Sequence, residues 1–257
     1  MKHEKIKLII LGTIAGFLSA SFGIGGGVIF VPALYLLLNY EIKTVIGTSL
    51  AAIAPTAFVG ALSYYILGTV EFKLVIILFM ITGSIAGAKL GAMAANRMQS
   101  NIFLKIIAIL FFTVGLKLSN IVSMPLTSIS ITNSYMFLIL LGFLAGSVSA
   151  LFGIGSGVVI VSSLILFFGM KSHEAIVISL SVVAPTTLAG AFFHKQFDNI
   201  NLSAIKFLVP SALCGAVTGT IFASSLDADT LRIIFGIFLI LISIRFFFQK
   251  KNYTNNS

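Results

Sequence analysis

The sequence predicts an all-α polytopic membrane protein, built of helices that cross the bilayer several times. Of its 257 residues, 58% are hydrophobic and only 9% are charged, and the mean hydropathy is +1.13. A soluble domain needs about a quarter of its residues charged to cover its surface. The apolar residues also form runs long enough to span a membrane, and part of the pattern occurs twice in the chain.

Eight charge-poor apolar runs are the candidate membrane segments. They lie at about 8–38, 45–67, 74–95, 102–118, 134–169, 175–193, 203–224 and 230–248. A run of about 23 residues rises about 35 Å as a helix, which is enough to cross a hydrocarbon core of about 30 Å. The runs at 8–38 and 134–169 would extend about 46 and 54 Å, and each contains a glycine cluster that breaks a helix. We therefore expect these two runs to form broken or re-entrant helices.

An internal duplication divides the chain into two halves. Residues 16–28 and 146–158 are identical at nine of 13 positions, at an offset of 130. The same offset aligns Ser49 with Ser179 and carries an Ala-Pro-Thr sequence from one half to the other. We interpret the chain as a first transmembrane repeat at 1–118, a linker at 119–133, a second repeat at 134–250 and a polar tail at 251–257.

The positive charges favour one topology over another. If each long run crosses the membrane once and the N-terminus is inside, ten Lys and Arg residues lie nearer the cytoplasm and six lie outside. If each long run folds back as a hairpin, the tally becomes twelve against four. The positive-inside rule therefore favours hairpins. Each half then crosses the membrane an odd number of times, so that the two repeats have inverted topology, as in many secondary transporters.

Composition also excludes several classes of function. The net charge is +9, but the basic residues stand singly at the ends of apolar runs or in the tails, which argues against nucleic acid as a partner. All seven acidic residues fall at or beyond the expected helix ends, and His, Cys and acidic residues form no metal-binding group. A nucleophile paired with a base is also missing from the spans. We expect no enzyme activity, no metal and no cofactor.

The two glycine clusters are the first candidate substrate site. An unsatisfied backbone amide in lipid costs several kcal/mol, so a helix break at membrane depth must be buried in protein or line a wet cavity. The helix that follows each break presents free N–H groups and a partial positive charge, which suits an anion. The alternative is that the glycines only allow close helix packing or a kink. The candidate residues are Ser21, Gly23, Gly25, Gly26 and Gly27, with Gly153, Gly155, Ser156 and Gly157.

Hydroxyl groups beside two prolines are the second candidate. Ser49 and Ser179 precede the helix-kinking Pro55 and Pro185 by six residues in equivalent helices. With Thr48, these hydroxyls are expected to donate hydrogen bonds to an oxyanion. The alternative is that each hydroxyl bonds the carbonyl four residues earlier in its own helix.

Two further titratable residues have alternative interpretations. His194 is followed by Lys195 at the end of an apolar run, so it is expected at a solvated helix end, with proton handling as the alternative. Lys89 is expected to extend to the lipid headgroups, with attraction of the substrate as the alternative.

The glycine motifs also resemble those of a known family. The sequence Gly-Phe-Leu-Ser-Ala-Ser-Phe-Gly-Ile-Gly-Gly-Gly at 16–27, Gly-Thr-Ser-Leu-Ala at 47–51 and the four-residue spacing of Gly83, Gly87 and Gly91 resemble the sulfite exporter TauE/SafE family. The resemblance implies a multi-pass permease of a bacterial or archaeal inner membrane, which moves sulfite, a sulfonate or another small sulfur-containing anion. The second half departs from the pattern at Ser156, which replaces a glycine, and at Ser162, which stands where the first half has Pro32.

These observations together predict a secondary transporter. Half-helix N-termini at the two glycine clusters, with Ser49 and Ser179, are expected to hold an oxyanion near the bilayer midplane, while the repeats rock to alternate access. An anion channel and a non-transporting membrane scaffold are the alternative functions. The sequence leaves open which anion moves, in which direction, with which coupling ion, and whether the chain forms a homodimer.

Overall fold

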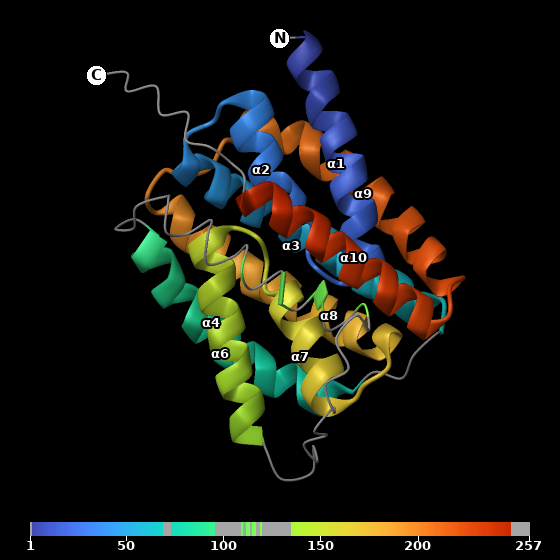
Figure 1. Cartoon of the computed structure of the whole chain (residues 1–257). Helices are drawn as coiled ribbons and strands as arrows, with labels where there is room; N and C mark the ends of the chain where they lie inside the picture. Colours follow the sequence, from blue (N-terminus) through green and yellow to red (C-terminus); the bar gives the residue numbers. More distant parts are fainter. Residues whose placement is uncertain are drawn as a thin grey trace.

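The described chain is a bundle of helices without strands (Figure 1). The computed structural model describes residues 2–68, 73–95 and 135–247, with a few isolated positions between 109 and 119. Six of the helices are long and apolar enough to cross a membrane. The predicted run at 102–118 and the linker at 119–133 lie almost wholly outside the described residues, and the tail at 251–257 lies wholly outside them. The helices are α1 Lys2–Phe22, α2 Gly27–Leu38, α3 Ile42–Ile66, α4 Leu74–Ala95, α6 Tyr135–Phe152, α7 Gly157–Phe168, α8 Ser172–Lys195, α9 Leu202–Ser224 and α10 Ala228–Phe247.

Both long apolar runs form helical hairpins. The first breaks between α1 and α2, and the Tyr40 hydroxyl beyond α2 donates a hydrogen bond of 2.9 Å to Glu4 in the first turn of α1. Burial and this contact raise the pKa of Tyr40 to about 12, so the phenol keeps its proton at neutral pH. The second run breaks between α6 and α7, and the rings of Phe137 and Phe168 at its two ends lie 5.7 Å apart. Each run therefore turns back on itself, as the charge distribution predicted.

The two proline-containing helices, α3 and α8, form the centre of the bundle. Within an apolar stretch of 18 residues in each helix, 72% of the α3 residues and 61% of the α8 residues are buried, against 44% in each of the other four candidate spans. A Cβ added at Gly60 of α3 would lie 3.2 Å from Leu180 of α8, and one added at Gly190 of α8 would lie 3.2 Å from Leu50 of α3. Residue numbers rise along one helix as they fall along the other, so α3 and α8 pack antiparallel.

Glycine stripes hold the outer helices in two close parallel pairs. A Cβ added at Gly83, Gly87 or Gly91 of α4 would overlap backbone carbonyls of successive turns of α6. In the same way, Gly215 and Gly219 of α9 face carbonyls of successive turns of α1. Because only glycine lets two helix backbones approach this closely, the stripes determine which helices become neighbours. Each pair joins one helix of a hairpin to a helix from the other half of the chain.

Candidate functional site

The two helix breaks have nearly identical backbone conformations. Gly23 and Gly153 have φ angles of 69° and 68°, and Gly25 and Gly155 both have φ of 82°. These left-handed values favour glycine because a Cβ would clash with the backbone. The breaks differ at one position, where Gly26 has φ of 75° and the corresponding Ser156 has φ of −75°.

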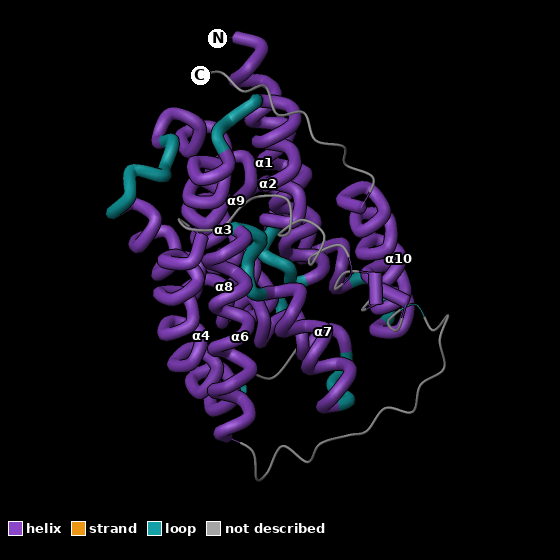
Figure 2. Tube along the Cα trace, turned by 60° about the vertical axis from the view of Figure 1, so that its left-hand side comes forward, coloured by secondary structure: helices purple, strands orange, loops and turns teal. Residues whose placement is uncertain are grey.

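The breaks are buried and lie against each other in the middle of the bundle, where Figure 2 shows loop segments in teal. A Cβ added at Gly155 would lie 3.0 Å from the carbonyl oxygen of Ile24 and 3.6 Å from the Cα of Gly25. One added at Gly25 would lie 3.0 Å from both Ile53 of α3 and Val183 of α8. The two hairpin tips are therefore in direct contact, with apolar side chains of the central helices beside them.

Ser49 and Ser179 link each central helix to one break. The Ser49 hydroxyl on α3 donates a hydrogen bond of 2.7 Å to the carbonyl of Gly153. The Ser179 hydroxyl on α8 donates one of 2.7 Å to the carbonyl of Gly23. Both side chains are fully buried. The structure thus brings both serines to the breaks, where they satisfy carbonyls that the unwound backbone leaves without a helical partner.

Two other predicted residues have partners away from the breaks. The Ser21 hydroxyl lies 2.8 Å from the Phe17 carbonyl of its own helix and 3.1 Å from the Gly219 carbonyl of α9. The Thr48 hydroxyl accepts a hydrogen bond of 2.9 Å from the backbone N–H of Asn201, in the connection between α8 and α9. Ser21 therefore links α1 to α9, and Thr48 links the first part of α3 to the connection between α8 and α9.

The remaining predicted glycines and the two prolines lie at helix starts and inside helices, respectively. Gly27 and Gly157 begin α2 and α7, and a Cβ on either would collide with the break of the other hairpin. Pro55 and Pro185 lie inside α3 and α8. Thr56, directly after Pro55, donates a hydrogen bond to the carbonyl of Ala52 four residues earlier in its own helix.

His194 is buried, so the expectation of a solvated helix end was wrong. Its Nε2 lies 2.9 Å from the carbonyl oxygen of Ala150, near the end of α6. Because a carbonyl only accepts, this nitrogen carries a proton. The residue 130 positions earlier is Tyr64, whose buried hydroxyl donates to the carbonyl of Ala20 at 3.2 Å. Alignment of His194 with Tyr64 was the signal in the sequence for this matched pair of contacts.

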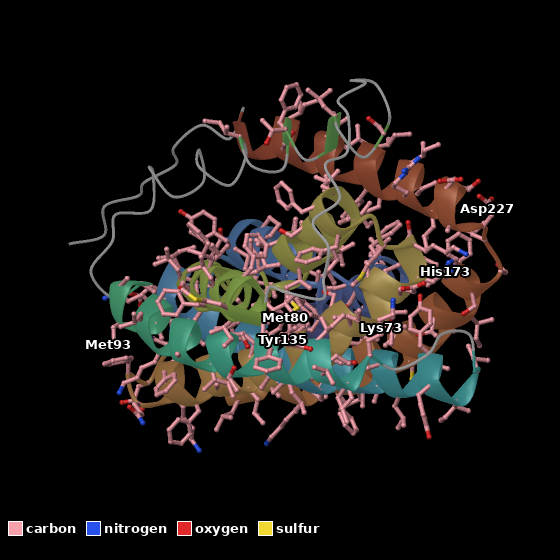
Figure 3. The ribbon with its side chains drawn as sticks, turned by 90° about the horizontal axis from the view of Figure 1, so that it is seen from below. Lys73, Met80, Met93, Tyr135, His173 and Asp227 are labelled. Atoms are coloured by element: carbon pink, nitrogen blue, oxygen red, sulfur yellow. The ribbon has the colours of Figure 1, made fainter. Side chains whose placement is uncertain are left out.

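Charged side chains of the described chain lie toward the ends of the helices. Lys73, just before α4, forms an ion pair with Glu174 in the first turn of α8. Lys73, His173 and Asp227 lie on the right in Figure 3, opposite Met93 near the other end of α4. Lys89 is exposed. The described residues include neither a buried carboxylate nor a group of ligands suited to a metal ion.

Comparison with known proteins gives a consistent match over most of the chain. The family model described as "Sulfite exporter TauE/SafE" matches residues 1–118 and 138–257. The chain is 28% identical to "Probable membrane transporter protein YunE" of Bacillus subtilis, covering 94% of this chain and 97% of that protein. It is 26% identical to "Probable membrane transporter protein YdhB" of the same organism, covering 88% of this chain and 91% of that protein. A "Probable membrane transporter protein" of Haemophilus influenzae is 28% identical, over 94% of this chain and 97% of that protein.

Proposed function

The chain belongs to the sulfite exporter TauE/SafE family and is a multi-pass membrane transporter rather than an enzyme; on this premise we propose that it is a secondary permease for a small sulfur oxyanion. The substrate would bind where the two helix breaks meet, and alternating access would carry it across the membrane.

The observation that carries this proposal is the pair of helix N-termini at the breaks. In the first turns of α2 and α7, the leading N–H groups have no carbonyl of their own helix to bond. Neither cap residue, Gly26 nor Ser156, supplies a side-chain hydrogen bond to them. Such N–H groups and the helix dipole attract a negative charge without a lysine or arginine. The site is therefore suited to an oxyanion such as sulfite, the substrate in the family's description.

The packing of equivalent helices supports a rocking mechanism. α3 and α8 align at an offset of 130 and run antiparallel, and Ser49 and Ser179 make reciprocal bonds to the opposite breaks. This is the relation expected of two inverted repeats about an axis in the membrane plane. The glycine-packed pairs, α1 with α9 and α4 with α6, each join the two repeats, so in our proposal these pairs are the two rigid bodies, and the breaks between them separate and close during transport.

The contact between the breaks favours a carrier over an open channel. Gly25, Gly155 and their apolar neighbours Ile53 and Val183 close the centre of the bundle in this conformation. An anion can enter only after the hairpin tips move apart. Each transport cycle then requires a conformational change, which limits the rate to that of a carrier.

A flux assay tests the proposed function. Purified protein in proteoliposomes would be loaded with sulfite, sulfate, thiosulfate or an organosulfonate, with and without a pH gradient. We expect saturable flux of at least one sulfur oxyanion above that of protein-free vesicles. Flux of none of these anions would contradict the proposal, and single-channel currents far above carrier rates would replace it with a channel.

A further inference from the structure

Three buried hydroxyl groups near the breaks have no hydrogen-bond partner among the residues that the structure describes. They belong to Ser19 in α1, Ser149 in α6 and Ser156 at the N-terminus of α7, and all three side chains are fully buried. Buried polar groups are nearly always paired, so each exception requires an explanation. Ser19 and Ser149 are separated by 130 residues, so the same exception occurs at the same position of both hairpins.

Neighbouring serines show that pairing within the helix is available in these hairpins. Ser21, two residues after Ser19, lies 2.8 Å from the Phe17 carbonyl of its own helix. Ser147, two residues before Ser149, donates to the Phe143 carbonyl at 2.8 Å. Serines in helices commonly form this bond. Ser19 and Ser149 do not form this bond within their helices, so their hydroxyls can donate to another group.

Two of the unpaired hydroxyls lie at the helix N-termini, and Ser149 has the position in the second hairpin that Ser19 has in the first. A Cβ added at Gly26, the N-cap of α2, would lie 3.3 Å from the Cβ of Ser19. Ser156 is itself the N-cap of α7, and its hydroxyl makes no capping bond. A free donor hydroxyl therefore accompanies the free N–H groups at each of the two helix starts. A ligand that accepts several hydrogen bonds and carries negative charge matches both kinds of donor.

We propose that Ser19, Ser149 and Ser156 are the hydroxyl donors to the transported oxyanion. This inference rests on the proposed function and changes the donor set expected from the sequence, because Ser49 and Ser179 already donate to the breaks themselves. Each hairpin contributes one anion subsite, made of its helix N-terminus and the serine in the last turn before the break.

The two subsites differ in strength. The second hairpin has two free hydroxyls, on Ser149 and Ser156, whereas the first has Ser19 and a glycine at position 26. Serine is strained at the left-handed φ of 75° that Gly26 adopts, and Ser156 takes −75° instead. The chain thereby gains a second donor at α7, and the subsite of the second hairpin binds the anion more tightly.

Alanine variants of the three serines test this proposal through sulfite transport. A hydrogen bond to a charged group is worth about a factor of ten or more in affinity. We expect Ser149→Ala, Ser156→Ala and Ser156→Gly each to raise the KM for sulfite about tenfold, with a smaller rise for Ser19→Ala. Ser162→Ala is the matched control, because this buried hydroxyl on α7 bonds Val158 of its own helix. Its KM should remain that of the wild type.

The outcomes separate this inference from the proposed function. Each variant removes a hydroxyl that bonds nothing in the described part of the chain, so all should elute from gel filtration as the wild type does. A second readout is the rise in melting temperature that sulfite produces, which should shrink in the same variants. Unchanged KM and unchanged sulfite stabilisation in all of them, with intact wild-type flux, would overturn the inference and leave the permease standing. A wild-type protein that neither binds nor moves any of the tested sulfur oxyanions would overturn both.

Discussion

At the scale of single residues, the breaks are held by hydroxyl groups from the central helices. Unwinding a helix inside the membrane leaves carbonyls that water cannot reach, and each must find a donor. Ser49 supplies a donor to Gly153 and Ser179 supplies one to Gly23. The donors come from the opposite half of the chain in both cases. These two bonds therefore stabilise the breaks and the contact between the halves together.

Replacing either serine should lower stability more than substrate affinity. Ser49→Ala or Ser179→Ala leaves a buried carbonyl unpaired, which costs about 1–3 kcal/mol. Thermal unfolding of the purified protein in detergent measures this cost. Ser181→Ala is the control, because the Ser181 hydroxyl bonds only Val177 within its own helix. Melting temperatures equal to that of the wild type in both test variants would show that these bonds do not hold the breaks.

Single side chains were the part of the site that sequence reasoning predicted least well. The sequence offered two roles for Ser49, donation to a ligand or to its own helix. In the structure it donates instead to the Gly153 carbonyl of the opposite break. Thr48 was expected to donate to the oxyanion with Ser49, but successive helix positions face different directions, and Thr48 contacts the connection at Asn201. His194 was expected at a solvated helix end because Lys195 follows it at the end of an apolar run, and only the structure shows that both His194 and the aligned Tyr64 are buried.

At the scale of elements, glycine spacing decides how the helices pair. In lipid the hydrophobic effect contributes little to the association of helices, so close packing of their backbones is the main attraction. Gly83, Gly87 and Gly91 recur every four residues and present one smooth face of α4 to α6. The exposed residues of the same helix, Ile85, Ala86 and Lys89 among them, lie outside this contact.

A methyl group on the glycine stripe should separate α4 from α6. In Gly87→Ala the new Cβ would overlap the Phe143 carbonyl, and overpacking of this kind costs about 1–3 kcal/mol. We expect a lower melting temperature in detergent and a smaller yield of folded protein. Ala86→Val adds more volume at the neighbouring exposed position and should leave both unchanged. An equal effect of the two substitutions would mean that the stripe does not form the helix contact.

Element boundaries were largely predictable from the chain because membrane thickness limits helix length. Runs of 31 and 36 apolar residues are longer than one helix needs to cross the membrane, and a glycine cluster inside each run indicated where the helix breaks. Charge counting then selected a hairpin, which the contacts between Glu4 and Tyr40 and between Phe137 and Phe168 confirm. Pairing of α4 with α6 and of α1 with α9 was beyond this reasoning, because the glycines and the carbonyls that they contact are far apart in sequence.

At the scale of the whole molecule, contacts join the halves at both ends of the central helices. At the start of α8, Glu174 forms an ion pair with Lys73 of the first half. At the start of α3, Thr48 accepts a hydrogen bond from the Asn201 backbone of the second half. Between these contacts, the hairpin tips meet at the centre. In the proposed mechanism, the contacts at one end of the central helices would break while those at the other end hold.

The most direct measurement is sulfite flux into proteoliposomes by the wild type and by Gly25→Val and Gly155→Val. Either valine would force a left-handed glycine position into strain and place side-chain atoms between the hairpin tips. Ala86→Val serves as the control for reconstitution. We predict that both break variants insert into the membrane and elute as the wild type does, while their flux falls to that of protein-free vesicles. Wild-type flux in both variants would contradict a substrate site at the breaks.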